Sequence, residues 1–539
     1  MTAFPDFRLS RRAPLAALLT TSVLLTACGS GGDGSGSGSG RPKSGGTLTF
    51  AVGSDAGCVD PQQVGSNDTI YSVRQVVDSL TDQDPRTGKI VPWLAKSWDI
   101  NSDATTFTFR LRSGVTFSDG SKLTAQVVKD NFDAVPKLGA LGTLAQGYLS
   151  GVRSTTVVDP LTVKVTFKEP NAQFLQATST HSLGIESSAS VRKTPQHKCS
   201  DGVIGSGPFV LKRYVQNQSI TLARRTGYAW GSSLWSKKDE AYLDTLVFKV
   251  VPEAGVRAGS LQSGQVDAVS SVGKANEAAL KGGQVALQRR ANPGLVFGLG
   301  LNNARPLLKD AKVRRAIQFA VDRQQIADTV FPTGTRPATS VLAHTTPDYT
   351  NLAADLALDA ARAKSLLDAA GWRPGSDGVR TKDGKKLSLT ITWFPNAATN
   401  QPALELVQQQ LKAVGIDVVL KQLQVSQFAT TLQSGDFDVV WGNVTRSDPD
   451  ILRNSFSTRL ANVYHLPPGS LDTALSAQAA TTVPAKRGQL VDEAQKLLVR
   501  NAYYVPVVEL QTQLGVSTKV HDLAFDSGSR IQLHDTWIG

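Results

Sequence analysis

The chain has 539 residues, which is too many for one hydrophobic core, so we expect two or three lobes. Its hydrophobic fraction of 40% and charged fraction of 19% are those of an ordinary globular protein and exclude a disordered one. The formal net charge is +12, but the basic residues are scattered, which argues against a nucleic-acid partner. A mild attraction to anionic lipid or cell wall is the simpler account of this charge.

The N-terminal 45 residues have the order of an export signal, a lipid anchor and a tether. A basic segment precedes the apolar run Leu15 to Leu25, which is about half the roughly 20 residues that a spanning helix needs. The following tetrad, Leu-Thr-Ala-Cys, ends at Cys28 and resembles the bacterial lipobox. We therefore expect a signal peptide at 1–27, lipidation of Cys28 and a Gly/Ser-rich tether at 28–45. A plain secretory signal is the alternative, and the Sec and twin-arginine routes both stay open.

Lipidation of Cys28 leaves Cys58 and Cys199 of the three cysteines. In an exported protein this even remainder predicts a disulfide, with two separate buried thiols as the alternative. Because no Cys-x-x-Cys pair occurs and the six histidines are scattered, we expect no metal site.

Alternating and helical patterns follow one another from residue 46 to about 290. The first strand is expected at 46–52, and apolar residues at helical spacing predict a helix from Ile70 to Leu80. Thr124 is the expected cap of a helix that runs to about Phe132. Further strands are expected at 106–111, 161–167, 209–222, 247–251 and 268–269, and a further helix at 257–266.

From about residue 290 helices and strands alternate as in an α/β domain. An amphipathic helix at 403–414 stops at Gly415 and leads into a strand at 416–420, which is half of an α/β unit. Further strands are expected at 297–301, 387–393, 437–441 and 504–508 and in the final twenty residues, and further helices at 310–321, 359–370 and 484–500.

Sequence motifs of enzymes are absent. There is no Gly-x-x-x-x-Gly-Lys-Ser/Thr loop, no His-Glu-x-x-His and no nucleophile elbow. Asp448 and Asp450 flank a proline, which is typical of a turn, and they lack the spacing of a calcium loop. The sequence predicts no catalytic residue and no cofactor, although a triad assembled from distant residues stays open.

Several segments occur in the order found in one family of binding proteins. They are 92–98 (PWLAKSW), 106–120 (TFTFRLRSGVTFSDG), 205–209 (GSGPF), 261–267 (LQSGQVD), 313–317 (VRRAI) and 448–449 (DP). Together they resemble the extracellular solute-binding proteins of ABC importers, family 5, which is the peptide and nickel class.

The resemblance implies an α/β chain with the two-lobed periplasmic-binding-protein-like fold (class II, cluster C type). The first lobe is expected at 46–290 with an extra inserted domain at about 67–185, the second at 291–505, and the return to the first lobe at 506–539. Two crossings between lobes form a hinge, and the lobes close on the solute. The closed monomer then docks on an ABC permease with its ATPase, on the extracellular side of the cell membrane, or the periplasmic side if an outer membrane exists.

In this class a segment of the second lobe, here 441–450, runs from a strand into an Asp-Pro turn at the cleft. Peptide-binding members carry an aspartate there for the peptide's ammonium group, and Thr445 stands at that position, followed by Arg446. A buried ammonium without a counter-charge costs several kcal/mol. Either another acid such as Asp55 serves, or the ligand is not a free-amino peptide. In the second case Arg446 pairs with a ligand carboxylate or phosphate. The alternative is that Arg446 lies on the surface or pairs with Asp448 or Asp450.

Other candidates lie at or after strand ends, where α/β clefts collect ligand groups. Trp393 and Trp441 offer aromatic faces to a solute, with core packing as the alternative. The expected ligand-binding residues are Ser54, Asp55, Asn303, Trp393, Asn396, Trp441, Thr445, Arg446 and Asp448.

These observations predict a lipid-anchored solute-binding component of an ABC importer, with a peptide as the leading solute. Oligosaccharides, opine-like anionic solutes and metal chelates stay open as ligands. A sensory binding lipoprotein without a transport role is a second hypothesis. A secreted hydrolase is a third, which the missing motifs disfavour.

Overall fold

The structure is a computed structural model that describes residues 41–539 except 396, 425–426 and 461. Residues 42–539 form one compact unit. The expected signal peptide, the lipidation site Cys28 and the tether up to residue 40 lie outside the described residues. Within the described part of the chain, no helix is both long and apolar enough to cross a membrane.

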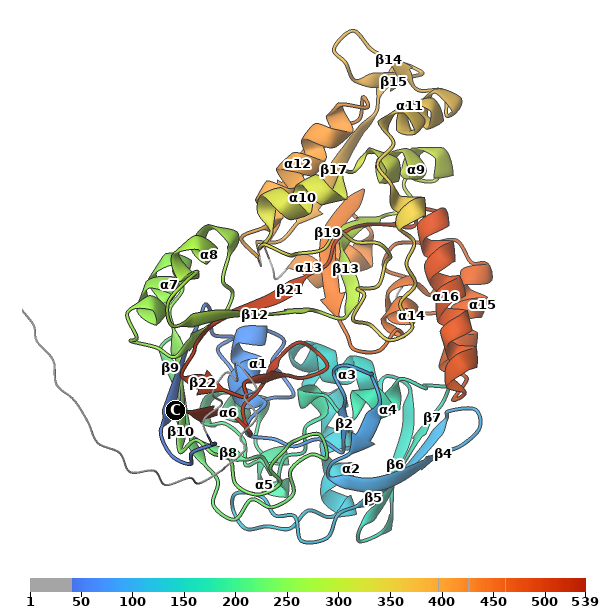
Figure 1. The fold of residues 1–539 in the computed structure, drawn as a ribbon. Coiled ribbons are helices and arrows are strands. Elements are labelled where there is room, and N and C mark those ends of the chain that lie inside the picture. Colours follow the sequence, from blue (N-terminus) through green and yellow to red (C-terminus); the bar gives the residue numbers. More distant parts are fainter. Residues whose placement is uncertain (1–40, 396, 425–426, 461) are drawn as a thin grey trace, which may run out of the picture. The chain divides into compact units, whose positions relative to one another are not determined.

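A seven-stranded sheet is the centre of the first lobe (Figure 1), with strand order β12-β21-β11-β1-β10-β9-β8. Its strands are β1 (Thr47–Val52), β8 (Phe209–Val215), β9 (Ser219–Arg224), β10 (Thr245–Val250), β11 (Ala268–Val269), β12 (Val285–Ala291) and β21 (Gln511–Ser517). Because strand side chains alternate, Phe50 of β1 packs into one hydrophobic cluster and its neighbour Ala51 into another. The cluster around Ala51 includes Leu261 from α7 (Ala254–Gln262) and Leu280 from α8 (Lys274–Leu280), so these two helices cover that face.

A smaller antiparallel sheet, with order β4-β5-β7-β6, comes from the chain between β1 and β8. Its strands are β4 (Ala95–Ile100), β5 (Thr106–Leu111), β6 (Val152–Asp159) and β7 (Thr162–Phe167). Phe107 and Phe109 of β5 are fully buried, and both contact the ring of Phe174. Helices α2 (Ala125–Ala134) and α3 (Thr143–Leu149) pack on this core, and the Thr124 side chain caps α2 as predicted. The short strands β2 (Thr81–Gln83) and β3 (Ile90–Pro92) pair beside it.

The second lobe is built on a five-stranded sheet with order β18-β17-β19-β13-β20. Its strands are β13 (Gly294–Leu301), β17 (Ser388–Trp393), β18 (Asp417–Gln422), β19 (Val439–Thr445) and β20 (Tyr504–Val508). One face packs on α9 (Ala311–Ala320), α10 (Arg323–Val330), α11 (Ala360–Ala369) and α12 (Asn400–Lys412). The other packs on α14 (Ile451–Phe456), α15 (Ser470–Ala479) and α16 (Pro484–Arg500). The two-lobed α/β fold expected from the sequence is therefore confirmed.

The chain passes between the two large sheets twice, from β12 to β13 and from β20 to β21. The crossings fall at 292–293 and 509–510, against expected lobe boundaries at 290/291 and 505/506. The two crossing segments are bonded to each other. The backbone N–H of Asn292 donates to the carbonyl of Leu510 (2.8 Å), and the Asn292 Oδ1 accepts from the backbone N–H and the hydroxyl of Thr512 (3.0 and 2.8 Å).

The predicted helix from Ile70 to Leu80 is wrong over its second half. Helix α1 spans Asn67–Val73, and the chain after Arg74 leaves the helix. The carbonyls of Gln75 and Val76 accept instead from the N–H groups of Phe209 and Gly207, so the segment pairs with a loop 130 residues later. It is buried on every side rather than on one helical face, which is why apolar spacing misled the prediction.

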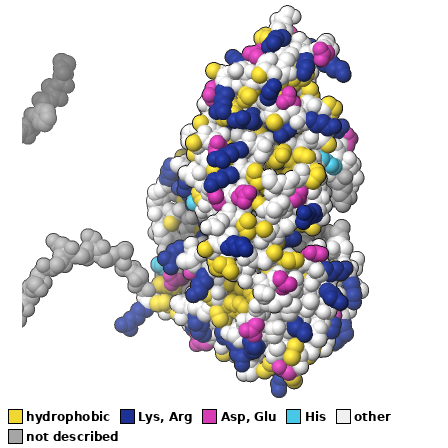
Figure 2. All heavy atoms as spheres, turned by 90° about the vertical axis from the view of Figure 1, so that its right-hand side faces the viewer, with side chains coloured by type: hydrophobic (Ala, Val, Ile, Leu, Met, Phe, Trp, Pro, Cys, Tyr) yellow, Lys and Arg dark blue, Asp and Glu magenta, His cyan; other side chains and the backbone are white. Residues whose placement is uncertain are grey.

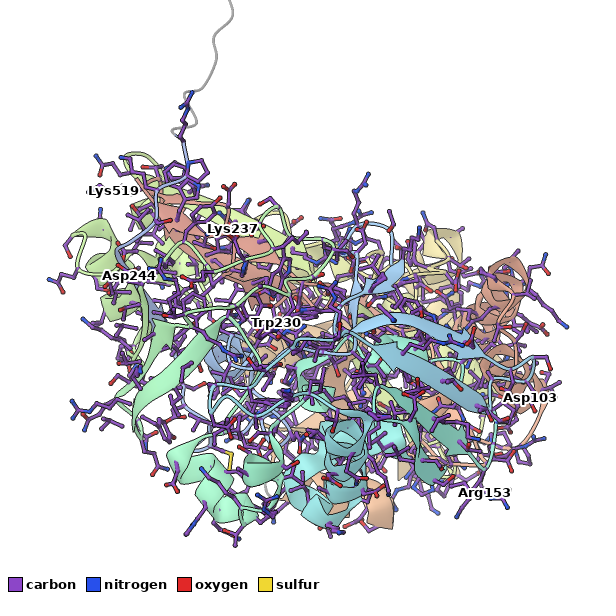
Figure 3. All side chains as sticks on the ribbon, turned by 90° about the horizontal axis from the view of Figure 1, so that it is seen from below. Asp103, Arg153, Trp230, Lys237, Asp244 and Lys519 are labelled. Carbon is purple, nitrogen blue, oxygen red and sulfur yellow. A yellow bond between two sulfur atoms is a disulfide. The ribbon has the colours of Figure 1, made fainter. Side chains whose placement is uncertain are left out.

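A disulfide joins Cys58, in the loop after β1, to Cys199 on α6 (Pro195–Asp201). Figure 3 draws it as a yellow bond. The neighbouring Lys198 is buried and pairs with Asp60 (2.8 Å) and Glu186 (3.3 Å). The covalent bond and this ion-pair cluster together attach the loop after β1 to α6.

Candidate ligand-binding site

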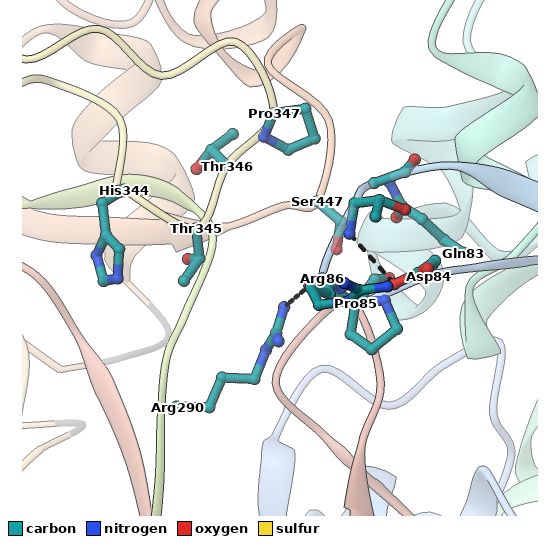
Figure 4. A pocket seen from close by; sticks show the side chains of 13 residues that line it. Gln83, Asp84, Pro85, Arg86, Arg290, His344, Thr345, Thr346, Pro347 and Ser447 are labelled. Carbon is teal, nitrogen blue, oxygen red and sulfur yellow. Dashed lines mark hydrogen bonds between the residues drawn. The ribbon is translucent and has the colours of Figure 1, made fainter. Parts of the chain in front are cut away.

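A cavity of about 380 Å³ lies where the two lobes meet beside the hinge (Figure 4). Its walls are the β2–β3 turn (83–88) from the first lobe, Arg290 on β12, the loop 344–347 and Ser447 from the second lobe, and Ser527 near the C-terminus. This volume lies within the range of pockets that hold small organic ligands. Since both lobes contribute walls, movement of one lobe against the other changes the cavity.

Polar and charged groups line this cavity. The guanidinium of Arg290 donates to the carbonyl of Pro85 (2.8 Å) and to the Ser529 hydroxyl (2.9 Å), which holds the β2–β3 turn against the hinge. Backbone N–H groups of Arg86 and Thr87 donate to the Asp84 carboxylate (2.8 and 3.2 Å), and the first of these bonds is the main cause of its lowered pKa. The cavity is thus suited to a polar solute.

The loop of the second lobe is fixed to the hinge from the other side. Nδ1 of His344 lies 2.5 Å from a carboxylate oxygen of Glu509, and the backbone N–H of His344 donates to the other oxygen (3.0 Å). Glu509 stands in the second crossing between lobes. The wall of the cavity is therefore attached directly to the segment about which the lobes would turn.

Arg446, which follows β19, spans the space between the lobes. Its backbone N–H donates to the carbonyl of Pro293 in the first crossing (3.0 Å). Its guanidinium carbon lies 4.0 Å from the ring centroid of Tyr148 on α3, in the insertion of the first lobe. The Nε and Nη1 atoms of Arg446 are buried and have no hydrogen-bond partner among the described residues.

Further arginines lie near the same place, around the buried His181. Burial, and then the positive charges of Arg530, Arg74 and Arg446, lower the pKa of His181 well below its usual value, so this imidazole is neutral. Arg74 and Arg530 each also have a buried Nε without a hydrogen-bond partner in the described structure. The charges that act most strongly on the His181 ring are therefore those of arginines.

Strand β19 has an open edge at its C-terminal end. Strand β17 pairs with it only at Val439 and Val440, whereas β13 follows it to Thr445, opposite Gly294. Because ladder bonds alternate along an antiparallel pair and the N–H of Arg446 bonds toward β13, the main-chain groups of Thr445 face the other edge. In the described part of the chain, no strand pairs with that edge here. An extended ligand can therefore pair with β19 beside Arg446.

The two tryptophans lie in the core of the second lobe. Trp441 is 2% exposed, stacks on Phe297 at 5.2 Å and donates from Nε1 to the Asn400 Oδ1 (3.0 Å). Trp393 is 6% exposed and belongs to the same hydrophobic cluster. For both residues the structure favours core packing over contact with a solute.

Asp448 and Asp55 already have protein partners. Arg487 on α16 binds Asp448 through two hydrogen bonds of 2.9 and 2.5 Å, so Asp448 is not the partner of Arg446. Asp55 accepts from the Tyr214 hydroxyl and from the backbone N–H of Asn217, both at 2.8 Å, and so holds the turn between β8 and β9. Neither acid is placed to meet a ligand ammonium beside Thr445.

The remaining candidates are scattered. Asn303 lies beyond the Leu301 end of β13, opposite the end where Gly294 meets Thr445, and its amide donates to the carbonyls of Leu301 and Tyr464. Asn396 lies outside the described residues. Ser54 is exposed and donates to the carboxylate of Asp68 on α1 (3.1 Å). Of the nine candidates, the described structure places Thr445 and Arg446 together at the cleft.

Sequence reasoning did not identify Tyr148, His181, Arg530 or Asp68. Tyr148 and His181 both come from the insertion at about 67–185, roughly 300 and 265 residues before Arg446 along the chain. No spacing pattern marks such pairs. Asp68 had a weak signal, because it stands in the first turn of the helix that follows the β1 end.

The comparisons with known proteins agree with this architecture. The family described as "Bacterial extracellular solute-binding proteins, family 5 Middle" matches residues 89–460. The glutathione-binding protein GsiB of Salmonella paratyphi A is 26% identical over 482 residues, which cover 86% of this chain and 88% of that protein. GsiB of Escherichia coli O157:H7 is 24% identical over 477 residues with the same coverage.

Solved structures with the same fold include NikA from Brucella suis in complex with Fe(III)-EDTA. Its TM-score is 0.79 at 25% identity, over 92% of this chain and 100% of NikA. The oligopeptide-binding protein AppA from Bacillus subtilis, in complex with a nonapeptide, has a TM-score of 0.75 at 20% identity, over 93% and 100% of the two chains. The chain belongs to the bacterial extracellular solute-binding proteins of family 5, which are the substrate-binding proteins of ABC importers and not enzymes.

Proposed function

We propose that this protein is the lipid-anchored substrate-binding component of an ABC importer for a peptide or peptide-like solute. The observation that carries the proposal is the open edge of β19 at Thr445, which precedes Arg446 and lies two residues before Ser447 in the wall of the interlobe cavity. Main-chain groups on a free strand edge bind extended peptides by strand addition, and this binding depends little on the side chains of the peptide.

The names of the relatives support a peptide-like solute. Two of them are called glutathione-binding proteins, and one solved structure with the same fold holds a nonapeptide. A second candidate solute is an anionic metal chelate, which the unpaired guanidinium of Arg446 and the Fe(III)-EDTA complex of NikA favour. Both candidates are small polar solutes that a closing cleft would enclose.

A thermal-shift screen tests this proposal. The chain from Pro42 onward contains the five hydrophobic clusters described for this structure, so it is the form to screen. The panel is tripeptides and glutathione, oligosaccharides, opines, and Fe(III)-EDTA. A ligand that binds only the folded protein raises its melting temperature by mass action. We expect shifts with tripeptides or glutathione, and a shift with oligosaccharides alone would contradict the proposal.

The anchor is tested separately in cells. A lipid on Cys28 with a Gly/Ser-rich stretch after it would keep the lobes within reach of the permease. The wild-type protein should sediment with membranes and carry acyl chains by mass spectrometry, whereas Cys28→Ala should lack the lipid. Wild-type protein that is unacylated at Cys28 would contradict the anchor and leave the binding function in place.

A further inference from the structure

We propose that Arg446 is the anion receptor of the interlobe cleft and that the solute presents a carboxylate, or a comparable oxyanion, to its guanidinium. This inference rests on the proposed binding function and specifies the charge of the solute. It implies that the end of β19 recognises a negative group on the ligand rather than an ammonium.

The face and the edge of the Arg446 guanidinium differ in their contacts, and the edge is covered but not hydrogen-bonded at Nε and Nη1, so a carboxylate reaches these atoms only after neighbouring groups move. Tyr148 lies over the guanidinium of Arg446 (4.0 Å from carbon to ring centroid), which occupies its face. Two of its three nitrogens, Nε and Nη1, are buried without partners among the described residues. Carboxylates bind guanidinium groups in the plane, through the N–H groups at the edge. Contact with Tyr148 and binding of a carboxylate are therefore compatible.

Helix α3 approaches this guanidinium closely. A Cβ atom on Gly147 would lie 3.2 Å from Nη2 of Arg446, which is tighter than an ordinary contact. A glycine at this position lets the helix backbone come near the charged group, and the next residue supplies the aromatic ring. The arginine is thus held by residues of the opposite lobe and does not extend freely into solvent.

Among the residues that the structure describes, no carboxylate bonds to Nε or Nη1 of Arg446. The acids of the nearby turn are engaged elsewhere, Asp448 with Arg487 and Asp450 with Arg453. His181, on which the charge of Arg446 acts, is buried and offers no negative charge. The buried Nε and Nη1 donors of Arg446 lack partners, which is costly, and a ligand carboxylate that bonded to them would offset that cost.

The test compares matched ligands and matched variants of the chain from Pro42 onward by calorimetry. Trialanine is used as the free acid, the C-terminal amide and the N-acetylated acid, and glutathione is used as the free acid and as its diethyl ester. The variants are Arg446→Gln and Arg446→Lys. The matched control is Arg305→Gln, because Arg305 pairs with Asp436 and Asp438 beside the opposite end of β19.

We expect amidation or esterification to weaken binding to the wild type at least 10-fold, and N-acetylation to weaken it less. Arg446→Gln should lose a similar factor for the acids, and in that variant the acid and the amide should bind alike. Arg446→Lys should recover only part of the affinity, because a lysine cannot form a planar fork. The control variant should bind as the wild type, and all variants should melt cooperatively without ligand.

The outcomes separate this inference from the proposed function. If the wild type binds acid and amide equally, or if Arg446→Gln binds the acid as well as the wild type does, the inference is wrong and the peptide function stands. If peptides do not bind but Fe(III)-EDTA binds through Arg446, the inference stands and the peptide function fails. A wild-type protein that binds none of these probes overturns both.

Discussion

Arg487, on helix α16, holds Asp448 through two parallel hydrogen bonds, Nη1 to Oδ2 at 2.9 Å and Nη2 to Oδ1 at 2.5 Å. Both side chains are largely buried, and Oδ1 of Asp448 also accepts from the backbone N–H of Asp450 (2.8 Å). The pair therefore joins the turn after β19 to α16. Because Arg446 lies two residues before Asp448, this ion pair also restrains the backbone next to Arg446.

Replacing Arg487 by methionine should lower the free energy of unfolding by about 3 kcal/mol, because it leaves the buried Asp448 carboxylate without its counter-charge. Urea unfolding measures the change. The matched control on the same helix is Arg500→Met, whose pair with Asp355 spans 3.4 Å and whose side chain is 61% exposed. The control should change stability by less than about 0.5 kcal/mol, and equal effects of the two variants would contradict the role of the Asp448 pair.

The bond between Cys58 and Cys199 should leave no reactive thiol in the unreduced, denatured chain from Pro42 onward. The bond spans a sequence separation of 141 residues. Removing it by the double change Cys58→Ser and Cys199→Ser should lower the free energy of unfolding by roughly 3–5 kcal/mol, because the unfolded chain gains conformational freedom. Thiol counting and urea unfolding check the two parts. Two titratable thiols per chain in the unreduced protein would show that the bridge does not form.

Stability should fall as the pH rises from about 4 to about 7 because of Asp78. Burial raises the pKa of this carboxyl to about 7, although Trp230 Nε1 donates to it at 2.9 Å and Arg74 lies nearby. The unfolded chain releases this proton near pH 4, so the folded state binds more protons between the two values. The stabilising contribution is complete below pH 4 and is lost by about pH 7.

Asp78→Asn removes this titration and serves as the reference. Relative to the variant, the wild type should lose free energy of unfolding on the order of 4 kcal/mol across the window, with no further loss above it. Urea unfolding at a series of pH values from 4 to 8 measures both proteins. Parallel pH profiles would mean that Asp78 does not titrate in this range.

Trp441→Phe should affect stability and leave binding unchanged, the reverse of the result expected for Arg446→Gln. The change removes the hydrogen bond to Asn400 and part of the stack on Phe297. We expect a loss of about 1–2 kcal/mol in the free energy of unfolding. Ligand affinity, measured by calorimetry, should change less than two-fold. A loss of affinity of 10-fold or more would show that Trp441 contributes to the ligand site.

The sequence predicted the bounds of several amphipathic elements, and also those of the fully buried strand at 504–508. The strand at 106–111 and the helix at 484–500 have the predicted bounds, because each buries one face and exposes the other. The prediction of a helix was wrong for the second half of the segment from Ile70 to Leu80. This half is buried on all sides, and its main-chain groups bond to a distant loop, so apolar spacing carries no information about its conformation.

At the candidate site, local features of the sequence could be predicted and contacts between distant residues could not. The resemblance to the family led to Arg446, because the strand and the Asp-Pro turn that mark this segment of the family are local features of the sequence. The role of Asp448 could not be predicted, because its partner Arg487 lies 39 residues later, on α16. The contact of Tyr148 with Arg446 could not be predicted for the same reason, because it joins residues of different lobes.

The bonds between the two crossing segments bear on how the lobes move. Since Asn292 bonds to both Leu510 and Thr512, the two crossing segments form one hydrogen-bonded pair and do not move independently. Two paired segments bend more easily about one axis than they twist, so we expect the lobes to open by rotation about a single hinge axis. Such bending changes a few backbone torsions and leaves the packing inside each lobe untouched. A solute that contacts both lobes then shifts the equilibrium toward the closed form by as much as it binds that form more tightly than the open one.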